Sequence, residues 1–251
     1  RVFRHNDLES LEDKLRWATA HRPAGGQIFI ITESIFSMDG DAAPLTEIVQ
    51  LKERYEATLM VDEAHATGLL GPQGRGLIHE LGLSGRIEIQ MGTLGKALGA
   101  SGGYICGQRV LIDYLVNRAR SFIFSTAPVP AAAAAALAGL QIAASSEGDE
   151  RRRHCRELGD FFERSTRAFK LPTTPARGMI RPIMMGDETA ALEAAAALQK
   201  QNVFVPAIRY PTVARGAARL RVCLTAAHTG MDVAQLCDAL NQTALTARAH
   251  A

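Results

Sequence analysis

Four short apolar segments constrain the fold of this chain most. They are QIFIITES, ATLMVDEAH, IEIQMGTLG and GGYICG, and a helical pattern, PLTEIVQLKERY, separates the first two. Alternation of short apolar segments with amphipathic helices predicts βαβ units, and therefore a mostly parallel sheet flanked by helices. Ligands of such sheets bind beyond the carboxyl ends of the strands.

Polar side chains follow the first three apolar segments at these expected strand ends. They are Glu33 and Ser34, then Asp62 and His65, then Thr93 and Lys96. Because the carboxyl ends of parallel strands share one edge of a sheet, we expect these side chains to converge. A cofactor site would have this composition.

The four residues from Asp62 to His65 also spell DEAH, the sequence by which one class of helicases holds magnesium and ATP. An ATPase of this kind needs a second element, the phosphate loop GxxxxGK[ST]. The segment that ends in Gly95-Lys96 lacks the first glycine, and Ala97 replaces the hydroxyl that would hold the metal. An ATPase would therefore need a phosphate loop upstream of Arg1.

Lys96 lies between glycines in TLGKALG, where a flexible backbone lets a bulky group approach. Lysine amines form Schiff bases with aldehydes such as pyridoxal phosphate, and an aspartate is the usual partner of the pyridinium nitrogen. Lys96 and Asp62 together therefore indicate this cofactor. His65 is placed to contact its phenolic oxygen and Thr93 its phosphate. Taken singly, such a lysine is most often a surface residue and such an aspartate a helix cap.

The pattern changes from about residue 143. A polar helix at about 148 to 169 is followed by MIRPIMM, ETAALEAAAALQKQN, VFVPAIRY, ARLRVCL and a final helix, DVAQLCDALNQTALTAR. Strands and helices in this order predict a second, smaller α+β domain. We therefore expect one domain at 1–142 and another at 143–251.

Composition narrows the class of protein further. Hydrophobic residues make up 47% of the 251 residues and charged residues 22%, as in ordinary soluble globular proteins. A net charge of +2 is too small for a nucleic-acid-binding surface. The basic run RRRHCR at 151–156 has acidic neighbours, which predicts a solvated helix face.

Two further features bear on the environment of the chain. Its four cysteines have no metal-ligand spacing, which favours a reduced, cytoplasmic protein with no metal site. No apolar run is long enough to span a membrane.

The alanine-rich tract PVPAAAAAALAGLQIAA is typical of a tightly packed buried helix.

Five motifs, in order and over essentially the whole chain, resemble the α-oxoamine synthases. They are ESIFSMDGDAAPL, VDEAHATGLLGPQGRG, GTLGKALGASGGYICG, RSFIFSTAPVP and PTVARGAARLRVCLTAAHTG. The resemblance implies an α/β protein of the aspartate-aminotransferase-like fold (fold type I of the pyridoxal-phosphate-dependent transferases) and a homodimer. Because the chain starts at Arg1 without the family's upstream segment, we expect 1–142 to be a partial cofactor-binding domain that lacks the N-terminal part of the fold.

The resemblance also implies roles for individual residues. Lys96 would be the Schiff-base lysine, Asp62 the partner of the ring nitrogen and His65 the contact of the phenolic oxygen. The remaining implied contacts are Ser37 and Thr93 with the cofactor, Ser125 and Thr126 with the neighbouring subunit's phosphate, Arg221 with the substrate carboxylate and Thr212 with the substrate pocket. Ser37 could equally be a turn residue. Without the resemblance, Arg219 and Arg221 would both be taken for surface arginines.

The implied activity is a decarboxylating C-acyl transfer. DEAHATG, STAPVP and IRYPTVARGAARLR most resemble family members that condense L-alanine with pimeloyl-CoA or a pimeloyl-carrier protein in biotin synthesis. A rival within the family joins glycine to acetyl-CoA. A third alternative is a non-catalytic subunit that partners a complete synthase, but such subunits normally lack the lysine found at position 96.

Overall fold

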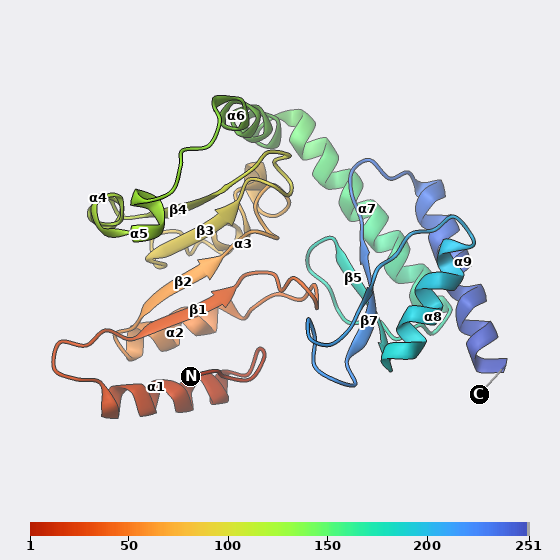
Figure 1. The fold of residues 1–251 in the computed structure, drawn as a ribbon, viewed down its shortest axis with the longest axis horizontal. Helices are drawn as coiled ribbons and strands as arrows, with labels where there is room; N and C mark the ends of the chain where they lie inside the picture. Colours follow the sequence, from red (N-terminus) through yellow and green to blue (C-terminus); the bar gives the residue numbers. More distant parts are fainter. Residues whose placement is uncertain (250–251) are drawn as a thin grey trace. The chain divides into compact units, whose positions relative to one another are not determined.

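The computed structural model describes residues 1–249, which divide into two units (Figure 1). The first unit contains Arg1–Ile35 and Ala42–Asp149. The second contains Phe36–Asp41 and the chain from Glu150 onward. The short segment Phe36–Asp41 therefore interrupts the first unit in sequence and packs with the second.

The first unit is built on a four-stranded sheet in the order β1-β2-β3-β4. Its strands are β1 (Phe29–Glu33), β2 (Thr58–Asp62), β3 (Ile89–Thr93) and β4 (Gly103–Gly107). The first three are parallel, and β4 runs antiparallel to β3. The four apolar segments thus form the four strands, and the predicted mostly parallel sheet is confirmed.

Helices cover part of this sheet in the first unit. They are α1 (Leu8–His21), α2 (Leu45–Arg54), α3 (Leu77–Glu80), α4 (Arg109–Arg118), α5 (Arg120–Ile123) and α6 (Pro130–Ala144), with a 3-10 turn η1 (Pro72–Gly74). Asp7 caps α1 by accepting a hydrogen bond from the Ser10 amide. The apolar side chains of α2 are buried, and α1 packs on α2 (Figure 1).

The two faces of the sheet differ in burial. Leu59 and Val61 on β2 are fully buried, whereas Phe29 and Ile31 on β1 are 58% and 64% exposed. Side chains alternate between faces along a strand, and Glu33 on β1 is the register partner of Asp62. Asp62 therefore lies on the more exposed face, at the carboxyl end of β2.

The second unit is an α+β arrangement, as predicted. Its antiparallel sheet has the order β5-β7-β6, with β5 (Ile180–Gly186), β6 (Ala207–Ile208) and β7 (Ala218–Cys223). Its helices are α7 (Ser146–Ala168), whose first residues belong to the first unit, α8 (Glu188–Gln199) and α9 (Gly230–Ala249). Asp187 caps α8 through the Ala190 amide.

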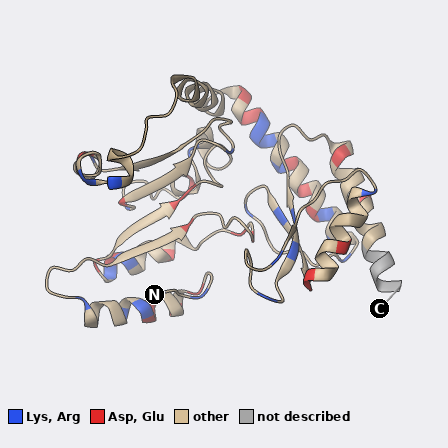
Figure 2. Ribbon diagram, viewed as in Figure 1, with Lys and Arg blue, Asp and Glu red and all other residues tan. Residues whose placement is uncertain are grey.

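The basic run on α7 is only partly the solvated face that its charges predicted. Figure 2 shows acidic and basic residues interleaved along the ribbon of this helix. Half of the run is exposed, but Arg152 is 5% exposed and Cys155 is 4% exposed. Leu158 and Phe162 are also buried, so Arg152 falls on the apolar stripe of helical spacing.

The alanine-rich helix α6 is not the buried helix that its composition suggested. Ala136 is its one buried residue, and Leu137 and Leu140 are 56% and 46% exposed. One side does pack closely: a Cβ on Gly139 would lie 2.3 Å from the Leu98 carbonyl oxygen. The prediction was wrong because apolar residues surround the whole helix, whereas unit 1 covers only one side.

None of the described helices combines the length and apolar character needed to cross a membrane. The four cysteines are unpaired; Cys106 and Cys223 are exposed, whereas Cys155 and Cys237 are buried. Burial raises the pKa of the Cys237 thiol to about 11.

An ion pair between Lys52 and Glu88 ties α2 to the sheet. Lys52 is 7% exposed, and its Nζ lies 2.5 Å from Glu88 Oε1. Glu88 Oε2 accepts the amide of Leu59 on β2 at 2.9 Å. Burial opposes ionisation of Glu88, but the bonds from Leu59 and Lys52 outweigh it and lower its pKa.

We expect Glu88→Ala to lower the free energy of unfolding by about 2 kcal/mol, because it leaves a buried ammonium unpaired. The loss is smaller than for a fully buried pair because the Glu88 side chain is 37% exposed. The pair's contribution should be present above the ordinary glutamate pKa of 4.5 and vanish as the pH falls through the lowered value. Urea unfolding at neutral and acidic pH measures both effects. The control Glu53→Ala, which breaks the exposed pair with Arg86, should change stability little, and equal losses would contradict the account.

Candidate functional site

The residues predicted at the strand ends lie at one edge of the first unit's sheet. Asp62 is the last residue of β2, and its register partners are Glu33 on β1 and Met91 on β3. Thr93 ends β3, and the Lys96 Nζ donates a hydrogen bond to Thr93 Oγ1 at 3.2 Å. Adjacent parallel strands therefore carry Asp62 and the Thr93–Lys96 pair to the same edge.

Asp62 begins a tight turn that also carries His65. Its Oδ1 accepts the Ala64 amide at 2.7 Å, which fixes the carboxylate. The carbonyl of Glu63 accepts the amides of Ala66 and Thr67, both at 2.9 Å. The half-buried His65 is thus held inside a hydrogen-bonded turn directly beyond β2. Within the described residues, no hydrogen bond to Asp62 Oδ2 is present.

Lys96 is exposed at the tip of a second turn, which joins β3 to β4. The amide of Leu94 donates to Gly102 at 2.9 Å, and that of Gly99 to Lys96 at 3.1 Å. Gly99 and Gly102 have φ values of +63° and +109°, which side-chain-bearing residues rarely adopt. The glycines of the motif therefore shape the turn that presents the lysine.

The Lys96 turn packs directly on the Asp62 turn. A Cβ built on Gly68 would lie 2.8 Å from the Cβ of Ala97, the residue after Lys96. Only a residue without a side chain fits there. The close approach joins the two turns that carry Asp62, His65 and Lys96 into one surface of unit 1.

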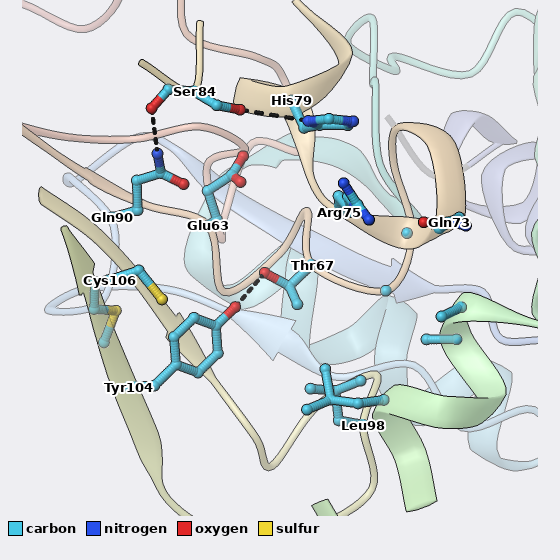
Figure 3. Close-up of a pocket in the computed structure, with 16 residues that line it drawn as sticks. Glu63, Thr67, Gln73, Arg75, His79, Ser84, Gln90, Leu98, Tyr104 and Cys106 are labelled. Atoms are coloured by element: carbon cyan, nitrogen blue, oxygen red, sulfur yellow. Dashed lines mark hydrogen bonds between the residues drawn. The ribbon is translucent and has the colours of Figure 1, made fainter. Parts of the chain in front are cut away.

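A separate cavity of about 650 Å³ lies in the first unit (Figure 3). Its lining includes Glu63, Thr67, Arg75, His79, Gln90, Leu98, Tyr104 and Cys106. Gln90 pairs with Cys106 across β3 and β4. Because side chains alternate, Gln90 and Cys106 point to the sheet face opposite Asp62. The cavity contains none of Asp62, His65, Thr93 and Lys96 in its lining, so it is not the predicted cofactor site.

In the second unit, Arg219 and Arg221 bind the segment Phe36–Asp41. Arg221 Nε donates to the Ser37 carbonyl oxygen at 2.8 Å. Arg219 is 5% exposed, and its Nη1 lies 2.5 Å from Asp39 Oδ1 and 3.1 Å from the Met38 carbonyl oxygen. Two of the predicted residues, Ser37 and Arg221, are therefore neighbours.

The interpretation of Arg219 and Arg221 as surface residues, made from local sequence alone, is wrong. Arg219 is buried because Asp39, far away in sequence, neutralises it, and Arg221 is half-buried on the same strand face. Beyond the Nε bond, no hydrogen bond to the Arg221 guanidinium is present in the described part of the chain. Its two terminal nitrogens are thus available for a bidentate ligand.

Three predicted residues lie in exposed segments. Thr212 follows β6 in a turn, where its amide donates to the Arg209 carbonyl oxygen at 3.0 Å. No hydrogen bond among the described residues joins Thr212 to Arg221. Ser125 and Thr126 follow α5, and the Ser125 hydroxyl donates to the Ser121 carbonyl. Their predicted contacts with substrate or with a neighbouring subunit remain predictions.

Sequence reasoning missed Glu63 and Asp39. Glu63 was considered only as a letter of the DEAH box, yet it is 4% exposed. A usable signal existed: strand alternation places Glu63 on the face opposite Asp62, which predicts a buried carboxyl group. For Asp39 no local signal was present, because its partner Arg219 is 180 residues away.

Comparison with known proteins agrees with this architecture. The family described as "Aminotransferase class I and II" matches residues 1–240. An 8-amino-7-oxononanoate synthase of Anaeromyxobacter sp. (strain K) is 47% identical over 231 residues, 92% of this chain and 56% of the relative. The same-named protein of Aromatoleum aromaticum is 43% identical over 240 residues, 96% of this chain and 60% of the relative.

Two solved structures share the fold. Sphingomonas wittichii serine palmitoyltransferase has a TM-score of 0.89 at 26% identity, covering 97% of this chain and 60% of that chain. The 8-amino-7-oxononanoate synthase of Francisella tularensis has a TM-score of 0.82 at 27% identity, covering 99% and 69%. The predicted aspartate-aminotransferase-like fold is confirmed. The chain spans 56% and 60% of the two sequence relatives' lengths and belongs to the aminotransferase class I and II family.

Proposed function

We propose that this chain is the greater part of a pyridoxal-phosphate-dependent enzyme that condenses L-alanine with a pimeloyl thioester. A bond forms between alanine Cα and the thioester carbonyl carbon, the thiol leaves, and the alanine carboxylate departs as carbon dioxide, giving 8-amino-7-oxononanoate. Identities of 43–47% to synthases of that name support the proposal. The observation that carries it is the Lys96 ammonium on Thr93, at the sheet edge that also presents Asp62.

The residues at this edge fit pyridoxal phosphate. The cofactor needs a nucleophilic amine, an anion for its ring nitrogen and donors for its phosphate. Lys96 is an exposed amine whose observed partner is the Thr93 hydroxyl. Asp62 keeps one carboxylate oxygen without a hydrogen bond among the described residues. A solved serine palmitoyltransferase with a TM-score of 0.89 to this chain contains the cofactor.

When bound, pyridoxal phosphate supplies an electron sink for the pair left on the substrate Cα. Lys96 would hold the cofactor covalently through Nζ, and its free amine would be placed to remove the Cα proton as a general base. Thr93 orients this amine through the 3.2 Å bond to its hydroxyl. The same hydroxyl retains its own proton, which it can donate to the phosphate.

Asp62 keeps the ring nitrogen protonated. A carboxylate at about 4 Å from a cation gains on the order of 4 kcal/mol at an effective dielectric near 20, before desolvation. The Ala64 amide already holds Oδ1, so the carboxylate would lose little orientational freedom on pairing with a ring nitrogen. His65, fixed in the following turn, serves as hydrogen-bond partner of the phenolic oxygen.

Arg221 binds the carboxylate of the amino-acid substrate. Its Nε is committed to the Ser37 carbonyl, which fixes the plane of the guanidinium and leaves the terminal nitrogens for a bidentate contact. Ser37, whose carbonyl oxygen accepts this bond, would be a contact of the cofactor. Thr212 lines the substrate side of the pocket.

Ser125 and Thr126 are proposed to reach the phosphate of a neighbouring subunit in a homodimer. Both residues are exposed, and the segment before them carries Phe122 and Phe124, which are 65% and 76% exposed. Large exposed aromatic side chains of this kind mark interaction surfaces. The shared site would make the dimer necessary for activity.

The choice of substrates is tested with full-length protein and added cofactor. Alanine and glycine are each paired with pimeloyl-CoA, pimeloyl-carrier protein and acetyl-CoA, and carbon dioxide and ketone products are measured. We expect the highest kcat/KM for alanine with a pimeloyl thioester. Preference for glycine with acetyl-CoA would identify the rival reaction. No turnover with any pair would favour a non-catalytic subunit, which Lys96 argues against.

A further inference from the structure

The Glu63 carboxyl group is buried directly behind the proposed cofactor site. Glu63 follows Asp62 in sequence but is 4% exposed and borders the cavity on the opposite face of the sheet (Figure 3). Carboxylates are rarely buried, because removing them from water is costly unless several hydrogen bonds compensate. The position of this one therefore calls for a specific partner.

The partner is the amino-terminal end of α3. Glu63 Oε1 accepts the Ile78 amide at 3.0 Å, and the neighbouring Leu77 amide also favours the ionised carboxylate and so lowers its pKa. The residue at the helix N-cap is Gly76, which supplies no side-chain bond. Glu63 thus caps a helix fifteen residues away in sequence. Burial raises the pKa of Glu63, and these amide bonds offset part of that effect.

Gly76 is required for this contact. Its φ is +99°, and a Cβ at this position would lie 2.0 Å from Glu63 Oε2. No side chain can be accommodated while the carboxylate occupies its place. The loop before α3 is therefore built around the Glu63 side chain.

The main chain of Glu63 anchors the turn on the other side. Its amide donates to the Met91 carbonyl on β3 at 2.7 Å, and its carbonyl accepts the amides of Ala66 and Thr67. One residue thus connects β3, the turn that carries Asp62 and His65, and α3. A shift of Glu63 would move both proposed cofactor contacts.

A second contact holds the far end of the same turn. The hydroxyl groups of Thr67 and Tyr104 are 2.9 Å apart (Figure 3). A Cβ on Gly92 would lie 2.3 Å from Tyr104 Oη, so a glycine on β3 lets the tyrosine side chain lie over that strand. Gly68, the next residue, touches Ala97 beside Lys96. The turn is fixed at both ends and against the lysine segment.

We propose that Glu63 is a positioning residue for the cofactor site: its carboxyl group fixes the Asp62–Thr67 turn relative to Lys96 through the amides of α3. The inference rests on the proposed function. The Asp62 carboxylate and the Lys96 amine are proposed to contact the cofactor. The Glu63 carboxyl group would act without touching it.

The test uses full-length protein with Glu63→Ala, Glu63→Asp and Glu63→Gln. Aspartate keeps the charge but is one methylene too short to reach the α3 amides, whereas glutamine keeps the length and one acceptor oxygen. We expect the alanine and aspartate variants to bind pyridoxal phosphate about tenfold more weakly, since the bond to the Ile78 amide is lost. Glutamine should restore most of the affinity.

Amide hydrogen exchange of the cofactor-free proteins gives a readout independent of activity. Exchange at Ala66, Thr67, Leu77 and Ile78 should accelerate in the aspartate variant and stay near wild type in the glutamine variant. The matched control is Glu80→Ala, which removes an exposed carboxylate at the end of α3 that accepts the Gly71 amide. It should leave cofactor affinity unchanged.

The outcomes separate the two proposals. If wild-type protein binds no pyridoxal phosphate, the proposed function fails. If wild type binds it and Glu63→Asp binds equally well with unchanged exchange, only the role of Glu63 is overturned. Weak binding by Glu63→Gln equal to that of Glu63→Asp, or an equal loss in Glu80→Ala, would also overturn it.

Discussion

Lys96→Ala is expected to eliminate both the covalent attachment of pyridoxal phosphate and turnover. A general base alone contributes about 10²–10⁴-fold to rate, and this substitution also removes the covalent anchor, so the loss should be at least about 10³-fold. The fold should survive, because Lys96 is exposed and its side chain makes one hydrogen bond among the described residues, to the Thr93 hydroxyl. Steady-state product formation and circular dichroism measure the two effects.

Two further variants make the test of Lys96 specific. Lys96→Arg preserves the charge and the bond to Thr93 but offers no nucleophilic amine, so it should be as inactive as the alanine variant. Lys200→Ala removes an exposed lysine of the second unit and should be fully active. An active Lys96→Arg protein would contradict the assignment, because a role of positive charge alone would then suffice.

Asp62→Asn should reduce exchange of the alanine Cα proton far more than it reduces cofactor binding. The amide keeps the bond from Ala64 but no longer stabilises a protonated ring nitrogen. An interaction on the order of 4 kcal/mol corresponds to a loss of up to about 10³-fold. Incorporation of solvent deuterium into alanine, followed by NMR, measures this step without the acyl substrate.

Glu33→Gln is the matched control for Asp62→Asn. Glu33 ends the neighbouring strand and is the register partner of Asp62, so both substitutions neutralise an acid at the same sheet edge. We expect near-normal exchange in the Glu33 variant. Equal losses in both variants would mean that the site needs negative charge in general and not a specific partner for the ring nitrogen. Unchanged exchange in Asp62→Asn would directly contradict the role of Asp62.

Much of the first unit follows from local sequence. Apolar runs of five or so residues with β-branched side chains gave the four strands, and helical spacing in PLTEIVQLKERY gave α2. The order of the elements then fixed the parallel pairing, which carried Asp62 and Thr93 to one edge. Local patterns suffice here because each element buries one face against its immediate neighbours in sequence.

The features that sequence did not reveal depend on distant partners. Phe36–Asp41 belongs to the second unit because Arg219 and Arg221 bind it, and neither contact is visible in a local window. The burial of Arg152 was also missed. Its charge predicted exposure to solvent, but its position on α7 places it on the buried apolar face of the helix. The exposure of α6 depends on which surfaces the rest of the chain covers, which composition does not specify.

The candidate site shows the same division. Sequence order and glycine spacing identified Lys96, Asp62 and Thr93. Both the chemistry of these residues and their positions at strand ends can be inferred from the local sequence. The bond that orients Lys96 on Thr93 spans three residues and was within reach of such reasoning. The anchoring of Glu63 on Ile78 was not, because it depends on how the loop before α3 folds back.

Borohydride reduction of full-length protein with pyridoxal phosphate, followed by mass mapping of the peptides, tests the central claim most directly. The claim is that Lys96 holds a cofactor whose ring nitrogen is bound by Asp62. We predict a single stable cofactor adduct on the peptide that contains Lys96, in both wild type and Asp62→Asn. An adduct on a different lysine, or none in the wild-type protein, would contradict the account.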